Sequence, residues 1–431
     1  MSLDAESNDH LWTGPFKIVI GIDIGVRQSA VSFACLKPGE KWSVRRVTQW
    51  PGKDSQNSHG KIPTAIWYDS TNKAVLFGAE AMTPQAEEEA EDNGWKLARY
   101  FKLHLHPPHL TAQHGLELEP LPFSVPLSQV YADFLGYLLQ HTQSYFEDHI
   151  IDGKRIWKQY KPTMEVVLAH PNGWGIREQA FFRLSAVKAG LTNASDAASR
   201  VHFVNEAEAS VHFCAQNPDI GSRLLPGMML VVCNAGRLTV ETTVNVVKSV
   251  HPIRLEETRP SKCIQAGGVF VDKAAEKYLC KILGKAGLSQ EDVEEYATRG
   301  AKDFELRSKR VFKDAANGQS IEIAGTRYNN TAIRARRGRI NLEGFEVKSF
   351  FDPCVDKILD SVSAQLQTSS VMHTIFLMGG FGQSPYLCEQ LKKRFEPIGC
   401  DIVATTRSVH TCVADGTIIW YSCNHGDNDK P

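Results

Sequence analysis

Residues 18–36, IVIGIDIGVRQSAVSFACL, combine an acid with a glycine turn, a pairing that can do phosphate chemistry. Asp23 lies on the opposite phase from isoleucines that recur at period two, the pattern of a half-buried strand. Gly25 permits a sharp turn and a close backbone approach, and Ser29 begins a returning strand. An acid at a strand end, beside free backbone N–H groups, can hold a metal-bound phosphate. The same pattern also fits an ordinary β-hairpin.

A second copy of this pattern occurs near the middle of the chain. Asn234, a spacer, Gly236, Arg237 and Thr239 follow the apolar run VVC and precede VETTVNVV. Both copies have an acid or amide, one spacer, a glycine and a later hydroxyl residue. The repeat predicts two similar lobes, whose hairpins could grip a polyphosphate from both sides. Chance similarity between two hairpins is the alternative.

Composition and charge exclude several classes of function. The 431 residues suffice for two or three domains of ~150 residues each, and 42% hydrophobic with 23% charged residues is typical of a globular protein. A net charge of −1 gives no electrostatic reason to bind nucleic acid or an anionic membrane. No apolar run approaches the ~20 residues that span a bilayer. We therefore expect neither nucleic acid nor membrane as a partner.

The cysteines and the N-terminus indicate a cytoplasmic protein. Ten cysteines are scattered without paired spacing, and several fall within apolar or helical patterns. Buried free thiols are therefore expected, which indicates a reducing compartment. The first 17 residues are polar and acidic and contain no signal-peptide core.

Strand and helix patterns are mixed along the chain, which predicts an α/β fold. Residues 104–109, HLHPPH, are expected to form a rigid loop rather than a metal site, because two prolines interrupt them and no Cys or Asp lies nearby. Ser384 and Pro385 have the residue types of a helix N-cap and first turn. Expected helices cover residues 79–101, 128–149, 176–190, 206–215, 270–283, 345–366 and 413–421; expected strands cover 62–68, 74–77, 165–169, 201–204 and 374–378.

Several blocks of the sequence resemble one known superfamily, that of actin, sugar kinases and the seventy-kilodalton heat-shock chaperones. The chain is most similar to the nucleotide-binding domain of divergent, fungal-type heat-shock members, over residues 17–423. GIDIGVRQSAVSF and VCNAGRLTVETTV resemble the two phosphate loops, VNEAEASVHF and CVADGTIIW the two connecting helices, and FLMGGFGQSPYL the adenosine loop. KIPTAIWY, LFGAEA, RYFKLHL and REQAFFRLSAVKAGL match further segments in the right order.

The resemblance implies a two-lobed actin-like fold, made of duplicated ribonuclease-H-like subdomains with two inserted subdomains. The ligand would lie at the bottom of the central cleft between the lobes. On this basis we expect a disordered N-terminus at 1–16, lobe I at 17–215 with an insertion at about 46–124, lobe II at 216–404 with an insertion at about 263–344, a closing helix at 405–425 that returns to lobe I, and a disordered tail at 426–431.

The resemblance also implies ATP or ADP with magnesium as ligands, and roles by position. Asp23 would orient the hydrated magnesium, Lys102 would reach the phosphates and the attacking water, and Glu206 would lie near both metal and water. Gly379 and Gly380 would let adenosine approach the backbone. The residues agree in chemistry, since two carboxylates and a lysine near a glycine-lined anion site suit phosphoryl transfer. The alternatives are a helix N-terminal acid for Glu206 and a solvated lysine for Lys102.

The phosphate loops depart from the family pattern. Where the family has two small hydroxyl residues after the first glycine, this chain has Val26 and Arg27. The family's Asp-x-Gly-Gly-Gly-Thr becomes Asn234-Ala235-Gly236-Arg237-Leu238-Thr239. Asparagine lacks the charge to hold a metal's water, and side chains replace glycines that let N–H groups approach phosphate. Glu305 and Lys309 resemble adenosine-gripping residues, but their spacing is one residue too long.

These departures argue against magnesium-ATP hydrolysis and leave two interpretations of the arginines. Arg27 and Arg237 either close the site by pairing with Asp23 or Glu206, or form a new anion site through bidentate bonds. Together with Gly25, Gly236, Thr239, Gly379 and Gly380, they are the expected ligand-binding residues. No β-rich peptide-binding domain follows residue 431, so we expect no chaperone cycle from this chain alone.

Three functions remain open. The first is a pseudo-ATPase that acts by binding a protein partner. The second is an enzyme that uses the interlobe cleft for a non-nucleotide small molecule, for example in a biosynthetic pathway. The third is a slow magnesium-ATPase, which the retained Asp23, Lys102 and Glu206 favour.

Overall fold

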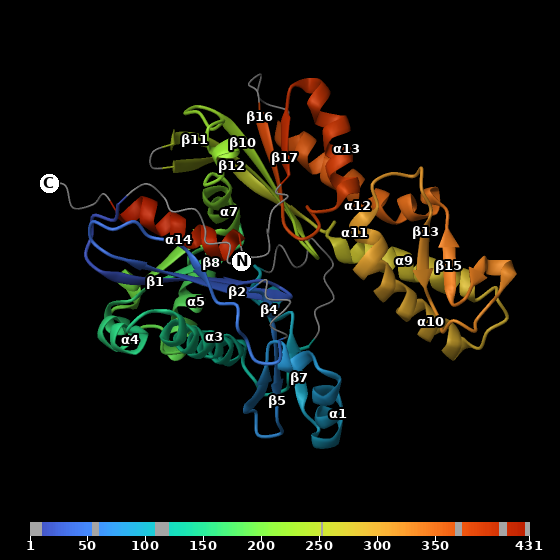
Figure 1. Ribbon diagram of the computed structural model, residues 1–431, viewed down its shortest axis with the longest axis horizontal. Helices are drawn as coiled ribbons and strands as arrows, with labels where there is room; N and C mark the ends of the chain where they lie inside the picture. The colour runs from blue at the N-terminus through green and yellow to red at the C-terminus, as the bar shows by residue number, and fades with distance from the viewer. Residues whose placement is uncertain are drawn as a thin grey trace. The chain divides into compact units, whose positions relative to one another are not determined.

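The computed structural model describes residues 11–53, 60–107, 120–250, 253–366, 373–404 and 412–426 (Figure 1). It is an α/β protein with mixed sheets, which confirms the expected class. The chain divides into two compact units: unit 1 comprises residues 1–225, 249–254 and 410–431, and unit 2 comprises residues 226–248 and 255–409.

The main sheet of unit 1 has the strand order β3-β2-β1-β8-β9. The first hairpin is antiparallel, whereas β8 and β9 run parallel to β1. Because parallel strands share one direction, the carboxyl ends of β1, β8 and β9 meet at the same edge. The strands are β1 (Lys17–Ile24), β2 (Gln28–Leu36), β3 (Arg45–Arg46), β8 (Glu165–His170) and β9 (Val201–Asn205), and β4 (Ile62–Pro63) pairs with β2.

The two faces of β1 pack against different helices. Its four isoleucines enter a core with α3 (Leu127–His149) and α5 (Ile176–Lys188), on the face below the sheet in Figure 1. Val19 belongs to a separate core with α7 (Glu206–Cys214) and α14 (Cys412–His425). By the period-two alternation of strands, Asp23 belongs to this second face.

Glycines set the close packing of α14. A Cβ on Gly21 would lie 1.8 Å from Thr417 Oγ1, and one on Gly416 would lie 1.8 Å from the carbonyl oxygen of Ala209 in α7. The helix expected at 405–425 therefore begins at Cys412 in the described residues and packs on β1 and α7 within unit 1.

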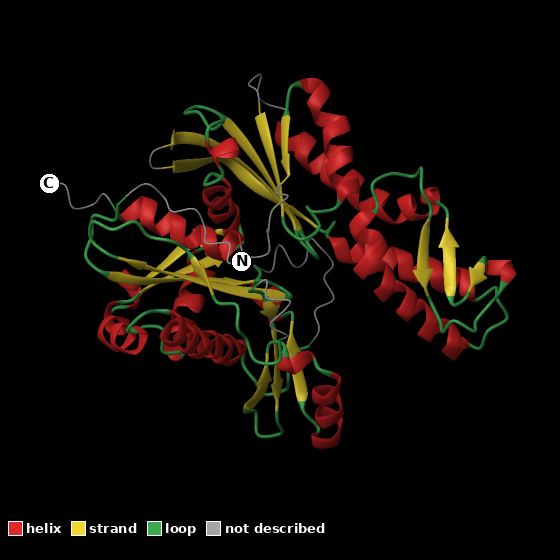
Figure 2. Ribbon diagram, viewed as in Figure 1, coloured by secondary structure: helices red, strands yellow, loops and turns green. Residues whose placement is uncertain are grey.

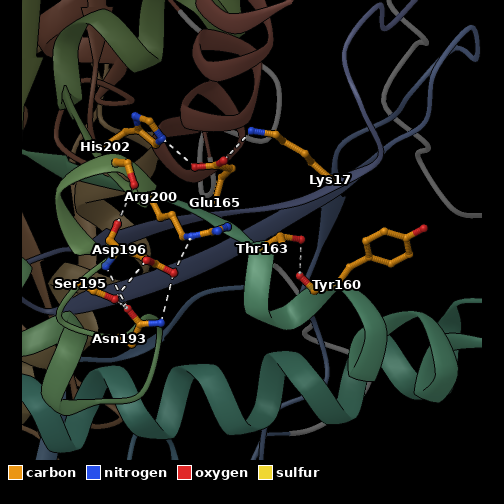
Figure 3. Close-up of polar contacts among 10 residues, drawn as sticks. Lys17, Tyr160, Thr163, Glu165, Asn193, Ser195, Asp196, Arg200 and His202 are labelled. Atoms are coloured by element: carbon orange, nitrogen blue, oxygen red, sulfur yellow. Dashed lines mark hydrogen bonds and ion pairs between the residues drawn. The ribbon is translucent and has the colours of Figure 1, made fainter.

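The amino-terminal edge of the same strands is held by one buried carboxylate. Glu165 Oε1 lies 2.5 Å from Lys17 Nζ and Glu165 Oε2 lies 2.9 Å from His202 Nε2, so one residue ties β1, β8 and β9 together (Figure 3). Burial opposes ionisation of Glu165, but the bonds from His202 and Lys17 outweigh it and lower the pKa of this carboxyl. Trp12, which the sequence places in the N-terminal tail, is buried and stacks on Tyr421 of α14.

A small three-stranded sheet and one helix complete unit 1. The sheet has the order β6-β5-β7 and comprises β5 (Ala65–Tyr68), β6 (Ala74–Phe77) and β7 (Lys96–Arg99), with α1 (Pro84–Asn93) beside it (Figure 2). The prediction of one helix over 79–101 is wrong at its end. Gly94 adopts a left-handed conformation with φ 66° and stops α1, so the chain leaves the helix and pairs with β5. Shorter helices are η2 (Glu80–Met82), η3 (Phe101–Leu105), α4 (Gly153–Tyr160), η4 (Lys161–Thr163), α6 (Ala197–Arg200) and α8 (Pro218–Gly221).

The main sheet of unit 2 repeats the topology of unit 1, with the order β12-β11-β10-β16-β17. An antiparallel hairpin is again followed by two parallel strands. The elements are β10 (Met229–Ala235), β11 (Val240–Val250), β12 (Ile253–Ile264), β16 (His373–Met378), β17 (Asp401–Ala404), α9 (Gly268–Leu283), α12 (Gly344–Leu366), α13 (Pro385–Phe395) and η7 (Glu396–Ile398). Ser384 accepts a bond from Leu387 N and caps α13, as predicted.

The rest of unit 2 is a second small sheet with helices. Its strands are β13 (Gln319–Glu322), β14 (Ala335–Arg336) and β15 (Arg339–Leu342), and α10 (Gln290–Asp303) lies beside them (Figure 2). The other helical elements are the π-helix η5 (Phe304–Ser308), α11 (Lys309–Val311) and η6 (Thr331–Ile333).

All ten cysteines lie in the described residues and are free thiols, as the sequence predicts. Among those same residues, none of the helices combines the length and the apolarity needed to cross a membrane.

Candidate functional site

Asp23 lies at the carboxyl end of β1, one residue before the turn, and only 4% of it is exposed. Lys61, next to β4, places its Nζ 3.9 Å from Asp23 Oδ2. Burial raises the pKa of the Asp23 carboxyl, Lys61 opposes that rise, and nearby Glu206 adds to it. The first candidate acid is thus a desolvated group with a lysine beside it.

Glu206 is the first residue of α7, directly after β9. The Asn205 side chain accepts bonds from the N–H groups of Ala207 and Glu208, which caps this helix and fixes where it starts. Lys102 Nζ donates to Glu206 Oε1 at 2.5 Å, and the lysine is 4% exposed. Lys102 is therefore not a solvated lysine, and that alternative is wrong. Glu206 does lie at the N-terminus of a helix, which was the alternative explanation for an acid at this position.

These four residues form what we call the strand-end cluster: Asp23, Lys61, Lys102 and Glu206. Two carboxylates meet two lysines, so the cluster has no formal net charge when all four are ionised. Magnesium prefers oxygen ligands, usually one or two carboxylates plus waters and phosphates. The described residues contain no group of three or more His, Cys, Asp or Glu side chains suited to a metal ion. Asp23 and Glu206 are carboxylates of the kind that magnesium takes, but a lysine lies beside each of them, so a magnesium ion would have to displace both lysines.

An aromatic and polar turn follows β8 and borders the cluster. The His170 ring donates from Nδ1 to the carbonyl oxygen of Pro171 at 2.8 Å, which leaves Nε2 to accept from Gln179 at 3.2 Å. Burial lowers the pKa of His170, which favours the neutral ring. Lys102 Nζ lies 5.9 Å from the centre of the Trp174 ring, within cation–π range.

The first turn is fixed by its backbone. A Cβ on Gly25 would lie 2.3 Å from the carbonyl oxygen of Gln28, so only glycine fits there. The carbonyl oxygen of Arg27 accepts a bond from Thr64 N at 2.8 Å, and Thr64 Oγ1 lies 2.8 Å from Ser29 Oγ. Arg27 and Val26 are half-buried. The expected arginine is thus present at the turn, on a backbone tied to the β4 segment.

In the second turn a glycine again lies close to the carbonyl oxygen three residues later, and the start of α9 forms hydrogen bonds with this turn. Gly236 N donates to the carbonyl oxygen of Thr239 at 3.0 Å, closing the turn. The N–H groups of residues 267, 268 and 269, at the start of α9, donate to the carbonyl oxygens of residues 238, 236 and 237. Free N–H groups at a helix start are natural anion sites. Here the turn itself uses these three.

The side chain of Arg237 is paired with acids of its own unit. Its Nη1 donates to Glu305 and lies 3.8 Å from Asp272 Oδ2. Lys309 Nζ bonds both oxygens of Asp272, at 2.7 and 2.8 Å, and the carbonyl oxygen of Gly268 at 2.5 Å. We call Arg237, Asp272, Glu305 and Lys309 the turn cluster. The sequence interpretation offered Asp23 or Glu206 as partners of Arg237, whereas the structure gives it Glu305 and Asp272.

The extra residue between Glu305 and Lys309 has a structural explanation. Residues 304–308 form a π-helical turn, which holds more residues per turn than an α-helix. The insertion is absorbed there, and both side chains still reach the turn cluster. One contacts Arg237 and the other contacts Asp272.

The two glycines of the adenosine-like loop differ in role. Gly379 has φ 84°, and a Cβ there would lie 2.4 Å from the carbonyl oxygen of Ala235. The absence of a side chain thus lets residue 379 pack closely against the end of β10. A Cβ on Gly380 would meet nothing within 4 Å.

The structure brings Asp23, Lys102 and Glu206 together in unit 1, and Gly236, Arg237, Thr239 and Gly379 lie on neighbouring loops of unit 2. Lys61, His170 and Asp272 were not predicted. Their contacts depend on strand pairing and on helix starts far away in sequence, for which no local pattern exists. Of residues 104–109, the last two lie outside the described residues; His104 is in η3, and His106 accepts a bond from Trp174.

No known protein family matches the sequence, and no curated protein is detectably similar to it.

Proposed function

We propose that this chain is a divergent member of the actin and heat-shock-seventy superfamily, with a two-lobed actin-like fold, in which ATP hydrolysis is lost or weak. The shared topology of the two main sheets supports the fold, because each unit has one antiparallel hairpin followed by two parallel strands. Each hairpin turns at a glycine that lies two residues after an acid or an amide, Asp23-Ile24-Gly25 in one and Asn234-Ala235-Gly236 in the other.

One observation carries the loss of hydrolysis: Asp23, Glu206 and the arginine of the second turn each already have an oppositely charged neighbour. Lys61 lies beside Asp23 and Lys102 binds Glu206. Arg237 binds Glu305. A hydrated magnesium ion and a triphosphate would have to displace these partners. Losing one preorganised donor near developing charge lowers a rate by about 10²–10³-fold, and here several groups change.

The strand-end cluster then serves a different ligand, and we propose an uncharged small molecule. A cluster without net charge offers little electrostatic attraction to an anion. Binding of a protein partner is the other use of a fold that has lost hydrolysis.

An enzyme of non-nucleotide chemistry is a second candidate, and Asp23 favours it. A buried carboxyl whose pKa is raised can hold and release a proton nearer to neutral pH than an exposed one. Asp23 would be its general acid or base, with Lys102 and Glu206 as positioning groups.

A thermal-shift titration with ATP, ADP and magnesium tests the proposed loss of nucleotide binding. We expect no rise in melting temperature with any of them, because the partners named above occupy the charged groups. A rise of several degrees with magnesium-ATP would support the slow ATPase instead. The charge-restoring variant Asn234→Asp serves as a comparison, and a rise seen only in that variant would assign the loss to the second turn.

A further inference from the structure

Asn172 is a buried amide in the turn that follows β8. Only 5% of the residue is exposed, and neither its Nδ2 nor its Oδ1 has a hydrogen-bond partner among the described residues. Leaving a buried amide unsatisfied costs the folded state the desolvation of its polar atoms, with no hydrogen bond in return. Such a buried amide calls for an explanation, and a ligand that completes its hydrogen bonds is one.

The neighbours of Asn172 in the same turn are satisfied. His170 bonds Pro171 and Gln179, and the indole nitrogen of Trp174 donates to His106 at 3.4 Å. The turn is thus built by other residues and does not use the asparagine side chain. The turn therefore keeps its conformation without any hydrogen bond from the Asn172 side chain.

The position of this turn connects Asn172 to the strand-end cluster. β8 lies between β1 and β9, so its carboxyl end lies between the end that holds Asp23 and the end that leads into Glu206. Trp174, two residues after the asparagine, lies near the cluster, since Lys102 Nζ is 5.9 Å from the centre of its ring. The charges of Glu206 and Lys102 also act on the pKa of His170, two residues before the asparagine. Ligands of α/β sheets bind at the carboxyl ends of the parallel strands.

We propose that Asn172 recognises an uncharged amide group, in a primary amide or a lactam, on the small molecule that binds at the strand-end cluster. This inference rests on the proposed function. An asparagine side chain offers one donor and one acceptor side by side, and an amide with a free N–H is its complement. The Nδ2–H group donates to the ligand carbonyl, and Oδ1 accepts from the ligand N–H. A charged group finds no uncompensated opposite charge in the cluster, since Asp23 and Glu206 already have lysines beside them.

Ligand-observed NMR with small probes tests the assignment. We expect 2-pyrrolidone and acetamide to bind the wild-type chain, and acetate, inorganic phosphate and N,N-dimethylacetamide, which has no N–H, to bind at least tenfold more weakly. Asn172→Leu, which removes both polar atoms at similar size, should weaken 2-pyrrolidone by about tenfold or more. Asn245→Leu, at a buried asparagine of β11, should leave that binding unchanged.

A second readout separates recognition from a structural role. Because the leucine replaces an unsatisfied amide, Asn172→Leu should raise the melting temperature of the ligand-free protein by about 2 °C. A lowered melting temperature together with unchanged 2-pyrrolidone binding would overturn the proposal. So would a crystal structure at saturating 2-pyrrolidone that shows an ordered water only at Asn172.

The outcomes for the two proposals are distinguishable. If the amide probes fail and magnesium-ATP also fails to stabilise the chain, the role of Asn172 is wrong and the loss of nucleotide binding stands. If magnesium-ATP binds and is turned over, the proposed function is wrong, whatever the amide probes do.

Discussion

The Lys102–Glu206 pair shows how a single substitution can test the strand-end cluster. Lys102 is nearly fully buried and its Nζ lies 2.5 Å from Glu206 Oε1. Removing one member of such a pair leaves a charge without compensation, whereas removing both leaves none. The single substitution should therefore destabilise the protein more than the double substitution.

Lys102→Met should lower the free energy of unfolding by roughly 3 kcal/mol, and Lys102→Met with Glu206→Gln should recover most of that loss. Urea denaturation followed by circular dichroism measures both. Lys248→Met is the control, because the Lys248–Glu256 pair is more than half exposed and contributes less than about 1 kcal/mol. Equal effects of Lys102→Met and Lys248→Met would contradict the buried pair.

His212 predicts how stability depends on pH. It is fully buried in α7, neither ring nitrogen has a partner among the described residues, and burial lowers its pKa from 6.5 to about 4. Between these pH values the unfolded chain binds a proton that the folded chain does not. Folding therefore loses stability as pH falls from 6.5 to about 4, by on the order of 3 kcal/mol.

His212→Leu should flatten this acid limb, since the variant has no proton to bind at this position. Chemical denaturation at a series of pH values measures it, with the exposed His149→Asn as the comparison. An unchanged slope in His212→Leu would show that other groups cause the acid sensitivity.

At the scale of elements, the contact between α7 and α14 determines where Glu206 lies. Gly416 in α14 touches the carbonyl of Ala209 in α7 so closely that no Cβ fits. A methyl group there must push the helices apart, and both belong to the core on the Asp23 face of β1.

Gly416→Ala should therefore destabilise the chain by about 3 kcal/mol, at the upper end of the cost of overpacking. Gly380→Ala, where a Cβ meets nothing within 4 Å, should change stability by less than about 0.5 kcal/mol. Thermal and urea unfolding compare the two. A tolerated Gly416→Ala would mean that the helices are not in close contact.

Elements with strong periodicity could be predicted from the sequence. The isoleucines of β1 and the apolar stripe of α3 specify a face each, so their type and position follow from local pattern. β7 could not be predicted, because it has only four residues, which is too short for a clear periodic pattern. These residues form a strand because they pair with β5. The sequence showed that Glu305 and Lys309 are one residue too far apart, but it did not predict the π-helical turn that accommodates the extra residue.

At the scale of the whole molecule, the duplicated hairpin could be predicted from the sequence, whereas the partners of the charged groups could not. The repeated turn predicts two similar hairpins, and both main sheets contain one. The pairing of Lys61 with Asp23 depends on β4 joining β2, and that of Arg237 with Glu305 depends on a helix more than sixty residues later. Residue type gives no sign of such contacts, so the sequence predicted the acids and the arginines but not what neutralises them.

Single-turnover hydrolysis of ATP, with the protein in excess over radiolabelled ATP and magnesium, tests the central claim most directly. Because lysines neutralise Asp23 and Glu206 and the turn itself uses the N–H groups at the start of α9, we expect no phosphate release above that of ATP with magnesium alone. Phosphate release at the rate of a working chaperone ATPase would contradict the account.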